Sequence, residues 1–206
     1  MAWPTWGSLR CRLLAMSGIK TRTAPTVQRL LDAGAAMVGK TVTDEFAFSM
    51  NGNNAHFGAP INGAAPDRIS GGSSSGSASA VSSGLCDFAL GTDTGGSVRN
   101  PASCCGIVGL KPTYGLVSRR GVFPLSFTLD HVGPMTRTVA DNALMLEAIA
   151  GHDPRDPGSA AAAQGHYGQA LDRGIRGLRV GFVRHFHEID TPADPEVTAA
   201  LEHVAR

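Results

Sequence analysis

The chain lacks the features that would assign it to a membrane or to nucleic acid. No apolar run approaches the roughly 18 residues that a membrane-spanning helix needs. The apolar stretch Leu13 to Met16 is shorter than the core of a signal peptide. Charge of one sign is not in excess, because 18 Lys+Arg face 17 Asp+Glu and the net charge is +1. We therefore expect a cytoplasmic protein that does not contact a membrane or bind nucleic acid directly.

Cysteines are few, and their spacing suits neither a zinc cluster nor a disulfide framework. Cys104 and Cys105 are adjacent, while Cys11 and Cys86 lie far from them along the chain. This pattern is typical of reduced proteins, so we expect free and mostly buried thiols.

Metal-binding patterns are also scarce. His185 and His187, followed by Glu188, could present two imidazoles on one face of a strand. No third ligand follows at a recognisable spacing, and a surface segment would explain the pair equally well. The sequence predicts no metal site and no cofactor.

What the chain does contain is apolar material in alternating helical and strand patterns. Hydrophobic residues make up 42% of the 206 residues, which is enough for a sizeable core and excludes a disordered chain. Helices are predicted over 23–34, 73–84, 138–151 and from Asp194 onward. Strands are predicted over 35–38, 88–91, 107–110 and 178–183. Residues 49–72 are predicted to form a long ordered loop, and residues 152–170 a connector. This alternation predicts an α/β domain.

Two helix predictions rest on particular residues. Thr138 and Asp141 resemble a capping box, and the helix that follows is expected to carry an apolar stripe of Ala140, Leu144 and Ala148 with the neighbouring Met145 and Ile149. The stretch 73–84 (SSSGSASAVSSG) could be a flexible linker, but its apolar positions continue into Leu85 to Leu90. A helix of small residues that packs closely against its neighbours fits better.

A phosphate-binding pattern is present in the wrong structural order. Residues 34–41 (GAAMVGKT) satisfy G-x-x-x-x-G-K-[ST]. That pattern binds phosphate when a strand precedes the loop and a helix follows it. Here a predicted helix precedes the pattern and a predicted strand occupies its middle, so we predict no nucleotide site.

Two Gly-Gly-Ser clusters flank the small-residue helix and the strand after it. The second cluster places Ser97 directly after a buried strand and a glycine turn. A serine hydroxyl is a weak nucleophile unless a base removes its proton, and amide hydrogens in a glycine turn can stabilise an oxyanion. A single such cluster is usually only a turn. A pair of them, with Asp93 and Arg99 beside the second, favours a catalytic site.

The stretches around these clusters are long and specific: GGSSSGSASA at 71–80 and GTDTGGSVRNPASCCGIVGLKPTYG at 91–115. They resemble the amidase signature family of serine amidohydrolases, and the resemblance continues from about residue 24 to residue 204. It implies an α/β fold with a mixed sheet flanked by helices. Residues 1–23 would then be an irregular N-terminal segment, and 24–206 a partial amidase signature domain with an incomplete core.

The resemblance also implies a Ser–cis-Ser–Lys triad. Ser97 matches the nucleophile, and Ser73, 24 residues earlier, matches the bridging serine that follows a cis peptide bond. The oxyanion hole would be formed by the backbone of Thr94, Gly95, Gly96 and Ser97. The supporting residues would be Ser74, Asp93 and Arg99.

The chain departs from the family at the lysine, which the family carries on a strand N-terminal to both clusters. Only three lysines are present, Lys20, Lys40 and Lys111, and none stands in the apolar–Val-Lys-Asp context of the family's base. We therefore interpret the chain as an internal fragment whose activity in isolation is doubtful.

The resemblance implies an amidase that hydrolyses linear carboxamides of small molecules. Two alternatives stay open: the glutamine-hydrolysing A-type subunit of a tRNA-dependent amidotransferase, and a truncated, catalytically dead pseudoenzyme. The expected partner is a small-molecule amide, with a second copy of the chain as an open alternative to a monomer.

Overall fold

The computed structural model describes residues 21–161 and 165–205, which fall into two compact units divided between Leu171 and Asp172. Residues 1–20, and with them Cys11, Lys20 and most of the expected N-terminal segment, lie outside the described residues. The elements of the first unit are α2 (Pro25–Asp32), the 3-10 helix η1 (Glu45–Ala47), α3 (Ser75–Ser82), β1 (Phe88–Asp93), α4 (Arg99–Cys104), β2 (Val108–Gly109), β3 (His131–Thr136) and α5 (Val139–Ile149). They are followed by η2 (Gly168–Arg173), the π-helical turn η3 (Phe186–Asp190) and α6 (Pro195–Val204).

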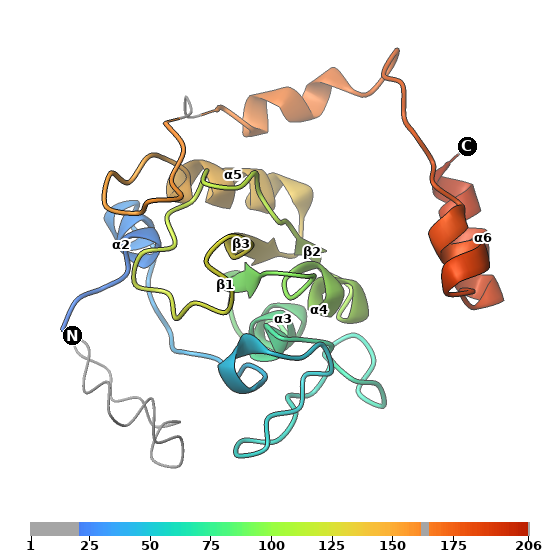
Figure 1. Ribbon diagram of the computed structural model, residues 1–206, viewed down its shortest axis with the longest axis horizontal. Helices are drawn as coiled ribbons and strands as arrows, with labels where there is room; N and C mark the ends of the chain where they lie inside the picture. The colour runs from blue at the N-terminus through green and yellow to red at the C-terminus, as the bar shows by residue number, and fades with distance from the viewer. Residues whose placement is uncertain (1–20, 162–164, 206) are drawn as a thin grey trace. The chain divides into compact units, whose positions relative to one another are not determined.

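The sheet of the first unit has the order β1-β3-β2, and both of its strand pairs are antiparallel. Helix α5 lies on one side of this sheet and helices α3 and α4 lie on the other (Figure 1). The predicted α/β class is confirmed.

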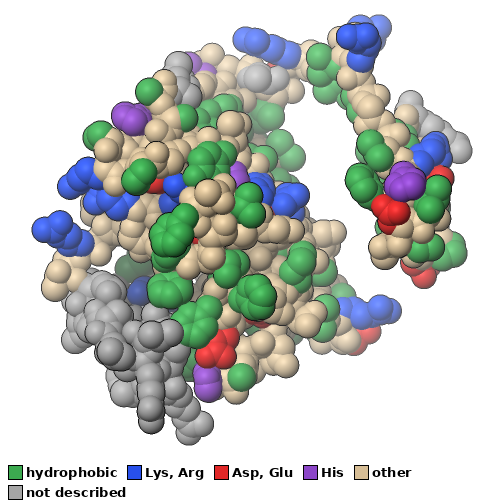
Figure 2. All heavy atoms as spheres, viewed as in Figure 1, with side chains coloured by type: hydrophobic (Ala, Val, Ile, Leu, Met, Phe, Trp, Pro, Cys, Tyr) green, Lys and Arg blue, Asp and Glu red, His purple; other side chains and the backbone are tan. Residues whose placement is uncertain are grey.

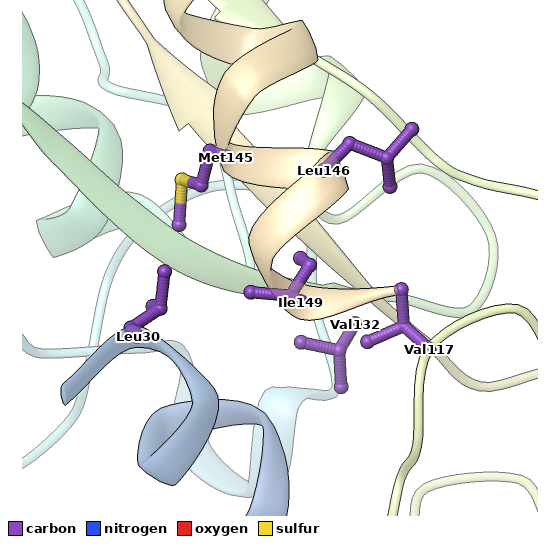
Figure 3. Packing of buried hydrophobic residues seen from close by; sticks show 6 residues of the cluster. All are labelled: Leu30, Val117, Val132, Met145, Leu146 and Ile149. Carbon is purple, nitrogen blue, oxygen red and sulfur yellow. The ribbon is translucent and has the colours of Figure 1, made fainter. Parts of the chain in front are cut away.

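The central strand β3 separates two hydrophobic clusters because its side chains alternate between the faces of the sheet. Val132 points into a cluster with Leu30 of α2 and with Met145 and Ile149 of α5, which Figure 3 shows at close range. Met135 points to the opposite face. It packs there with four other buried residues, Ala78, Val98, Ala102 and Cys105.

Sequence patterns failed to predict β3. Its sequence, HVGPMT, contains a glycine and a proline, which disfavour a central strand. Proline has no amide hydrogen to donate, but its carbonyl can still accept. The Pro134 carbonyl accepts hydrogen bonds from the Leu110 amide at 3.2 Å and the Asn142 side chain at 3.2 Å, so the sheet tolerates this residue. Pro134 therefore made this buried strand unrecognisable from the sequence, although its carbonyl takes part in the hydrogen bonding of the sheet.

Two predicted strands are absent from the described residues. Residues 36–38 and 178–183 are exposed and pair with no other segment, so their apolar pattern is not stabilised by a sheet. His185 and His187 do not share the face of a strand, because their segment forms the η3 turn, which has no buried residue. In the second unit, Arg184 connects η3 to α6 through ion pairs with Glu188 and Glu202.

Helix α5 confirms the predicted capping box and corrects the predicted apolar face. The Thr138 hydroxyl accepts a hydrogen bond from the Asp141 amide at 3.1 Å. Met145 and Ile149 of the expected stripe are buried, but Leu144 is 68% exposed and Leu146, outside the expected stripe, is buried. The difference arises because the helix contacts both β3 and α2, and this contact selects the face that is buried.

Three further features concern the cysteines, the phosphate-binding pattern and the length of the helices. Cys105 is buried, Cys86 and Cys104 are half-buried, and all three are free thiols. Residues 34–41 form neither a helix nor a strand, and Lys40 is exposed, so the phosphate-binding pattern lacks the helix it requires. Within the described ranges, no helix is long and apolar enough to cross a membrane.

The two α5 faces give a matched test of the core. Ile149→Ala should lower the free energy of unfolding by about 2–5 kcal/mol, because Ile149 is 0% exposed and a cavity would form. Leu144→Ala should change it by less than about 0.5 kcal/mol. Urea denaturation of both variants measures this difference, and equal losses would contradict the burial of the face that carries Ile149.

Candidate active site

Helix α3 brings the first Gly-Gly-Ser cluster against β1 because its side chains are small. Ala78 is fully buried, and the Ser77 hydroxyl donates a hydrogen bond of 2.8 Å to the Leu90 carbonyl of β1. A Cβ atom on Gly76 would come within 2.6 Å of a backbone oxygen. The predicted small-residue helix is confirmed. Ser73 stands two residues before it and follows a cis peptide bond from Gly72, as the resemblance implies.

The second cluster is a turn between β1 and α4 that is organised around the Asp93 carboxylate. Asp93 is 0% exposed and accepts hydrogen bonds from the backbone amides of Gly96 at 2.9 Å and Val98 at 3.2 Å. The Arg99 guanidinium binds the same carboxylate through two nitrogens, at 3.0 and 3.1 Å. Lys111 Nζ lies 3.3 Å from Asp93 Oδ1. One buried carboxylate thus holds both ends of the turn that carries Ser97.

The first residue of the turn has its own contacts. Lys111 Nζ donates a hydrogen bond of 2.7 Å to the Thr94 carbonyl, and the Thr94 hydroxyl donates one of 2.5 Å to Asp130. Asp130 in turn accepts hydrogen bonds from the amides of Leu125 and Ser126. The turn is therefore tied both to the segment after β2 and to the loop before β3.

The two clusters meet at Ser74. Its amide donates a hydrogen bond of 3.1 Å to the Ser97 carbonyl. Its hydroxyl accepts from the Thr92 amide at 3.1 Å and lies 3.3 Å from the Thr92 carbonyl. Ser73 and Ser97, which flank this junction, are 0% and 6% exposed. Two hydroxyl-bearing residues far apart in sequence are thus side by side in the fold.

The amides of the turn are not equivalent. The Gly96 amide is engaged by Asp93, so it is not available to a ligand in this arrangement. The amides of Thr94, Gly95 and Ser97 donate no hydrogen bond within the described ranges of the chain. Of the four expected oxyanion donors, these three keep a free N–H.

The Ser73 hydroxyl has no hydrogen-bond partner among the described residues although it is buried. Lys111 is occupied by Thr94 and Asp93, and Lys40 is exposed, so neither lysine serves Ser73. A buried polar group without a partner is destabilising by about 1–3 kcal/mol. The Ser73 hydroxyl is therefore a buried group at this site that lacks a hydrogen-bond partner among the described residues.

Sequence reasoning missed two residues that support the turn and the cis bond. Asn100 accepts a hydrogen bond of 3.1 Å from the Gly72 amide, and Lys111 bridges Asp93 and Thr94. Both residues lie within the stretch 91–115 that carries the family resemblance, but no role was inferred for them from it. Lys111 was considered only as a candidate base, and the signal that could have revealed its role was the buried acid it would need to neutralise.

The loop over 49–62 reaches the turn that carries Ser97 through Met50. A Cβ atom on Gly96, which has φ of +143°, would lie 2.8 Å from Met50 Cε. Met50 is 44% exposed, and Phe48 and Phe127 are 78% and 80% exposed. Apolar side chains of this kind are widespread on the visible face in Figure 2. The loop therefore presents an apolar side chain directly beside the serine-bearing turn.

The first unit is thus an α/β fold that carries a serine-bearing glycine turn between β1 and α4. A sequence model of the Amidase family matches residues 11–206, and the chain belongs to this family. The A subunit of the glutamyl-tRNA(Gln) amidotransferase of Synechococcus sp. (strain RCC307) is 51% identical over 180 residues, which are 86% of this chain and 37% of that protein. The corresponding protein of Rubrobacter xylanophilus is 54% identical over 154 residues, covering 75% of this chain and 32% of that protein.

Solved structures show the same relationship. The chain is similar to 6-aminohexanoate cyclic dimer hydrolase complexed with substrate, with a TM-score of 0.81 and 38% identity, over 88% of this chain and 38% of the hydrolase. It is also similar to a vestigial protein complex described as revealing the evolutionary origins of an s-triazine catabolic enzyme. That match has a TM-score of 0.74 and 46% identity, over 76% of this chain and 34% of the other. The chain thus spans about a third of the length of these relatives.

The Asp93 carboxylate should make the stability of the chain depend on pH. Burial raises its pKa, but hydrogen bonds from Arg99 and Val98, with the charges of Arg99 and Lys111, outweigh burial and hold the pKa at about 2. The unfolded value is about 3.9. Asp93 therefore contributes about 2 kcal/mol to the free energy of unfolding. This contribution is complete above pH ~4, where the carboxylate is ionised in both the folded and the unfolded chain, and it is lost as the pH falls through ~2.

Asp93→Asn should consequently lower the free energy of unfolding at pH 7 and flatten its decline between pH ~4 and ~2. Urea denaturation at a series of pH values measures both effects. Asp67→Asn is the control, because the Asp67 side chain is 81% exposed. A profile for Asp93→Asn that runs parallel to the wild type would contradict the role of Asp93.

Proposed function

We propose that the protein to which this chain belongs hydrolyses carboxamide bonds by acyl transfer, with Ser97 as nucleophile and Ser73 as the bridging serine. The observation that carries the proposal is the junction at Ser74, whose amide binds the Ser97 carbonyl. This contact joins Ser73, whose buried hydroxyl is unpartnered among the described residues, to the turn that carries Ser97 and three amide hydrogens that are free among the described residues. Free amides in a glycine turn are suited to an oxyanion, and the unpartnered hydroxyl is suited to pass on a proton.

In this mechanism the Ser97 Oγ attacks the amide carbonyl carbon, and its proton passes to Ser73, whose own proton passes to a base. The carbonyl oxygen becomes an oxyanion, which the amides of Thr94, Gly95 and Ser97 stabilise. The proton then returns by the same path to the departing amine as the C–N bond breaks. Water hydrolyses the acyl group from Ser97 by the reverse sequence of proton transfers.

The base is the part of the mechanism that the described residues do not supply. The resemblance assigns it to a lysine on a strand before the first cluster. A lysine acts as a base only where its pKa falls from about 10.4. Because neither Lys40 nor Lys111 contacts Ser73, the proposal requires a lysine from outside the described residues.

A second candidate function is the glutamine-hydrolysing subunit of a tRNA-dependent amidotransferase. The two relatives named above, at 51% and 54% identity, carry the name of that subunit. The same nucleophile would then release ammonia from glutamine, and partner subunits would be required. A catalytically dead form is the third candidate, supported by the unpartnered state of Ser73 among the described residues.

The nucleophile can be tested with a fluorophosphonate, which phosphonylates activated serines. We expect slow labelling of the chain at one site, Ser97, found by peptide mass spectrometry, and complete loss of label in Ser97→Ala. Ser103→Ala is the matched control, since Ser103 is an exposed serine on the adjacent α4. Label that survives in Ser97→Ala would overturn the assignment of the nucleophile.

Turnover separates the candidate functions. Without a base for Ser73, we expect amide hydrolysis by the isolated chain to be reduced by several orders of magnitude relative to a complete site. Glutaminase activity that rises on adding amidotransferase partner subunits would select the second candidate. Robust hydrolysis by the chain alone, lost in Ser97→Ala, would show that no external base is needed.

A further inference from the structure

The described part of the chain has a second unpartnered buried atom in the first unit besides the Ser73 hydroxyl: Asp44 Oδ1. Asp44 is 1% exposed, although a carboxylate is rarely buried without a cation or several hydrogen bonds. Its other oxygen, Oδ2, accepts one hydrogen bond, from the Gly52 amide at 3.2 Å. No Lys, Arg or His of the described ranges forms an ion pair with Asp44.

Asp44 and Ser73 lie against the same peptide bond. The Asp44 amide donates a hydrogen bond of 3.1 Å to the Ser73 carbonyl. The Asp44 carboxylate is so close to Gly72 that a Cβ there would come within 2.3 Å of Oδ2. One acceptor and one hydroxyl, both unpartnered within the described ranges, therefore flank the peptide bond between Gly72 and Ser73.

A buried carboxylate left without a cation is strongly unfavourable, because desolvation is not compensated by a partner. A single cationic donor placed within hydrogen-bond distance of both atoms would satisfy them together. An ammonium group has three N–H donors and no acceptor, whereas a guanidinium, which also has donors to spare, stays protonated and could not relay a proton. The chemistry of these two atoms thus favours a primary ammonium.

We propose that Asp44 is the counter-ion and positioning residue for a primary ammonium group that binds beside Ser73. The inference rests on the proposed function, in which this ammonium is the end of the lysine that acts as base. Asp44 would hold the nitrogen next to the Ser73 hydroxyl and would stabilise the ammonium that forms once the amine has accepted the Ser73 proton, while burial of the amine acts in the opposite sense and lowers its pKa. The probe for this site in the tests that follow is methylammonium.

The first test measures binding without turnover. The thermal midpoint of the chain at pH 7 should rise and saturate with methylammonium chloride, because a ligand that binds only the folded state stabilises it. Tetramethylammonium chloride at equal concentration should not reproduce the rise, since it has the charge but no N–H. In Asp44→Asn the half-saturating methylammonium concentration should increase at least tenfold, and in Asp67→Asn it should not change.

A second measurement uses the sign of a stability change. Without amine, Asp44→Asn should raise the thermal midpoint, because the Asn oxygen can still accept from Gly52 while the uncompensated charge is removed. An ordinary structural carboxylate would show a lower midpoint. Ser73→Ala provides an independent variant: it should weaken the methylammonium effect without lowering the midpoint of the free chain.

Each result decides for or against the ammonium site. A midpoint insensitive to methylammonium, an equal response in Asp44→Asn, or a lower midpoint of Asp44→Asn without amine would overturn it. Fluorophosphonate labelling of Ser97 in the same samples keeps the two proposals distinguishable. Labelling without an Asp44-dependent methylammonium effect would leave the nucleophile and remove the ammonium site. An Asp44-dependent effect without labelling would do the reverse.

Discussion

The carboxylate of Asp93 is the interaction on which the rest of the site depends. It ends β1, accepts hydrogen bonds from the amides of Gly96 and Val98 just before α4, and forms ion pairs with both Arg99 and Lys111. A glycine turn has few conformational constraints of its own. The buried acid supplies them, and the position of Ser97 follows from its hydrogen bonds.

The second cluster of constraints surrounds the cis bond between Gly72 and Ser73. Asn100 binds one side of it, the Asp44 amide binds the Ser73 carbonyl, and the Ser74 amide joins it to Ser97. The polar atoms that have no hydrogen-bond partner among the described residues are as informative about this site as the hydrogen bonds that are formed. The Ser73 hydroxyl and Asp44 Oδ1 are both buried beside that bond. In the proposed mechanism this chain provides the nucleophile and the amide donors, while the amine that acts as the base comes from outside the described residues.

Local patterns predicted the elements whose formation depends on short-range interactions. The capping box at Thr138, the small-residue helix after Ser73 and the strand that ends at Asp93 are all present. The failures share a different cause. The apolar run at 178–183 has no sheet to join among the described residues, and β3 became a central strand although Pro134 argues against one. Strand formation depends on partners that a local pattern does not contain.

By itself the sequence determined the family and the positions of the two serine clusters, because motif identity and spacing are properties of the chain alone. The tertiary structure decided which groups those clusters contact. It assigned Lys111 to Asp93 and Thr94 rather than to Ser73, directed the Gly96 amide to Asp93, and left Asp44 without a cation from the described ranges. Such pairings depend on the distance between atoms that are remote in sequence. A buried polar group without a partner is energetically unfavourable, so its presence points to a missing partner.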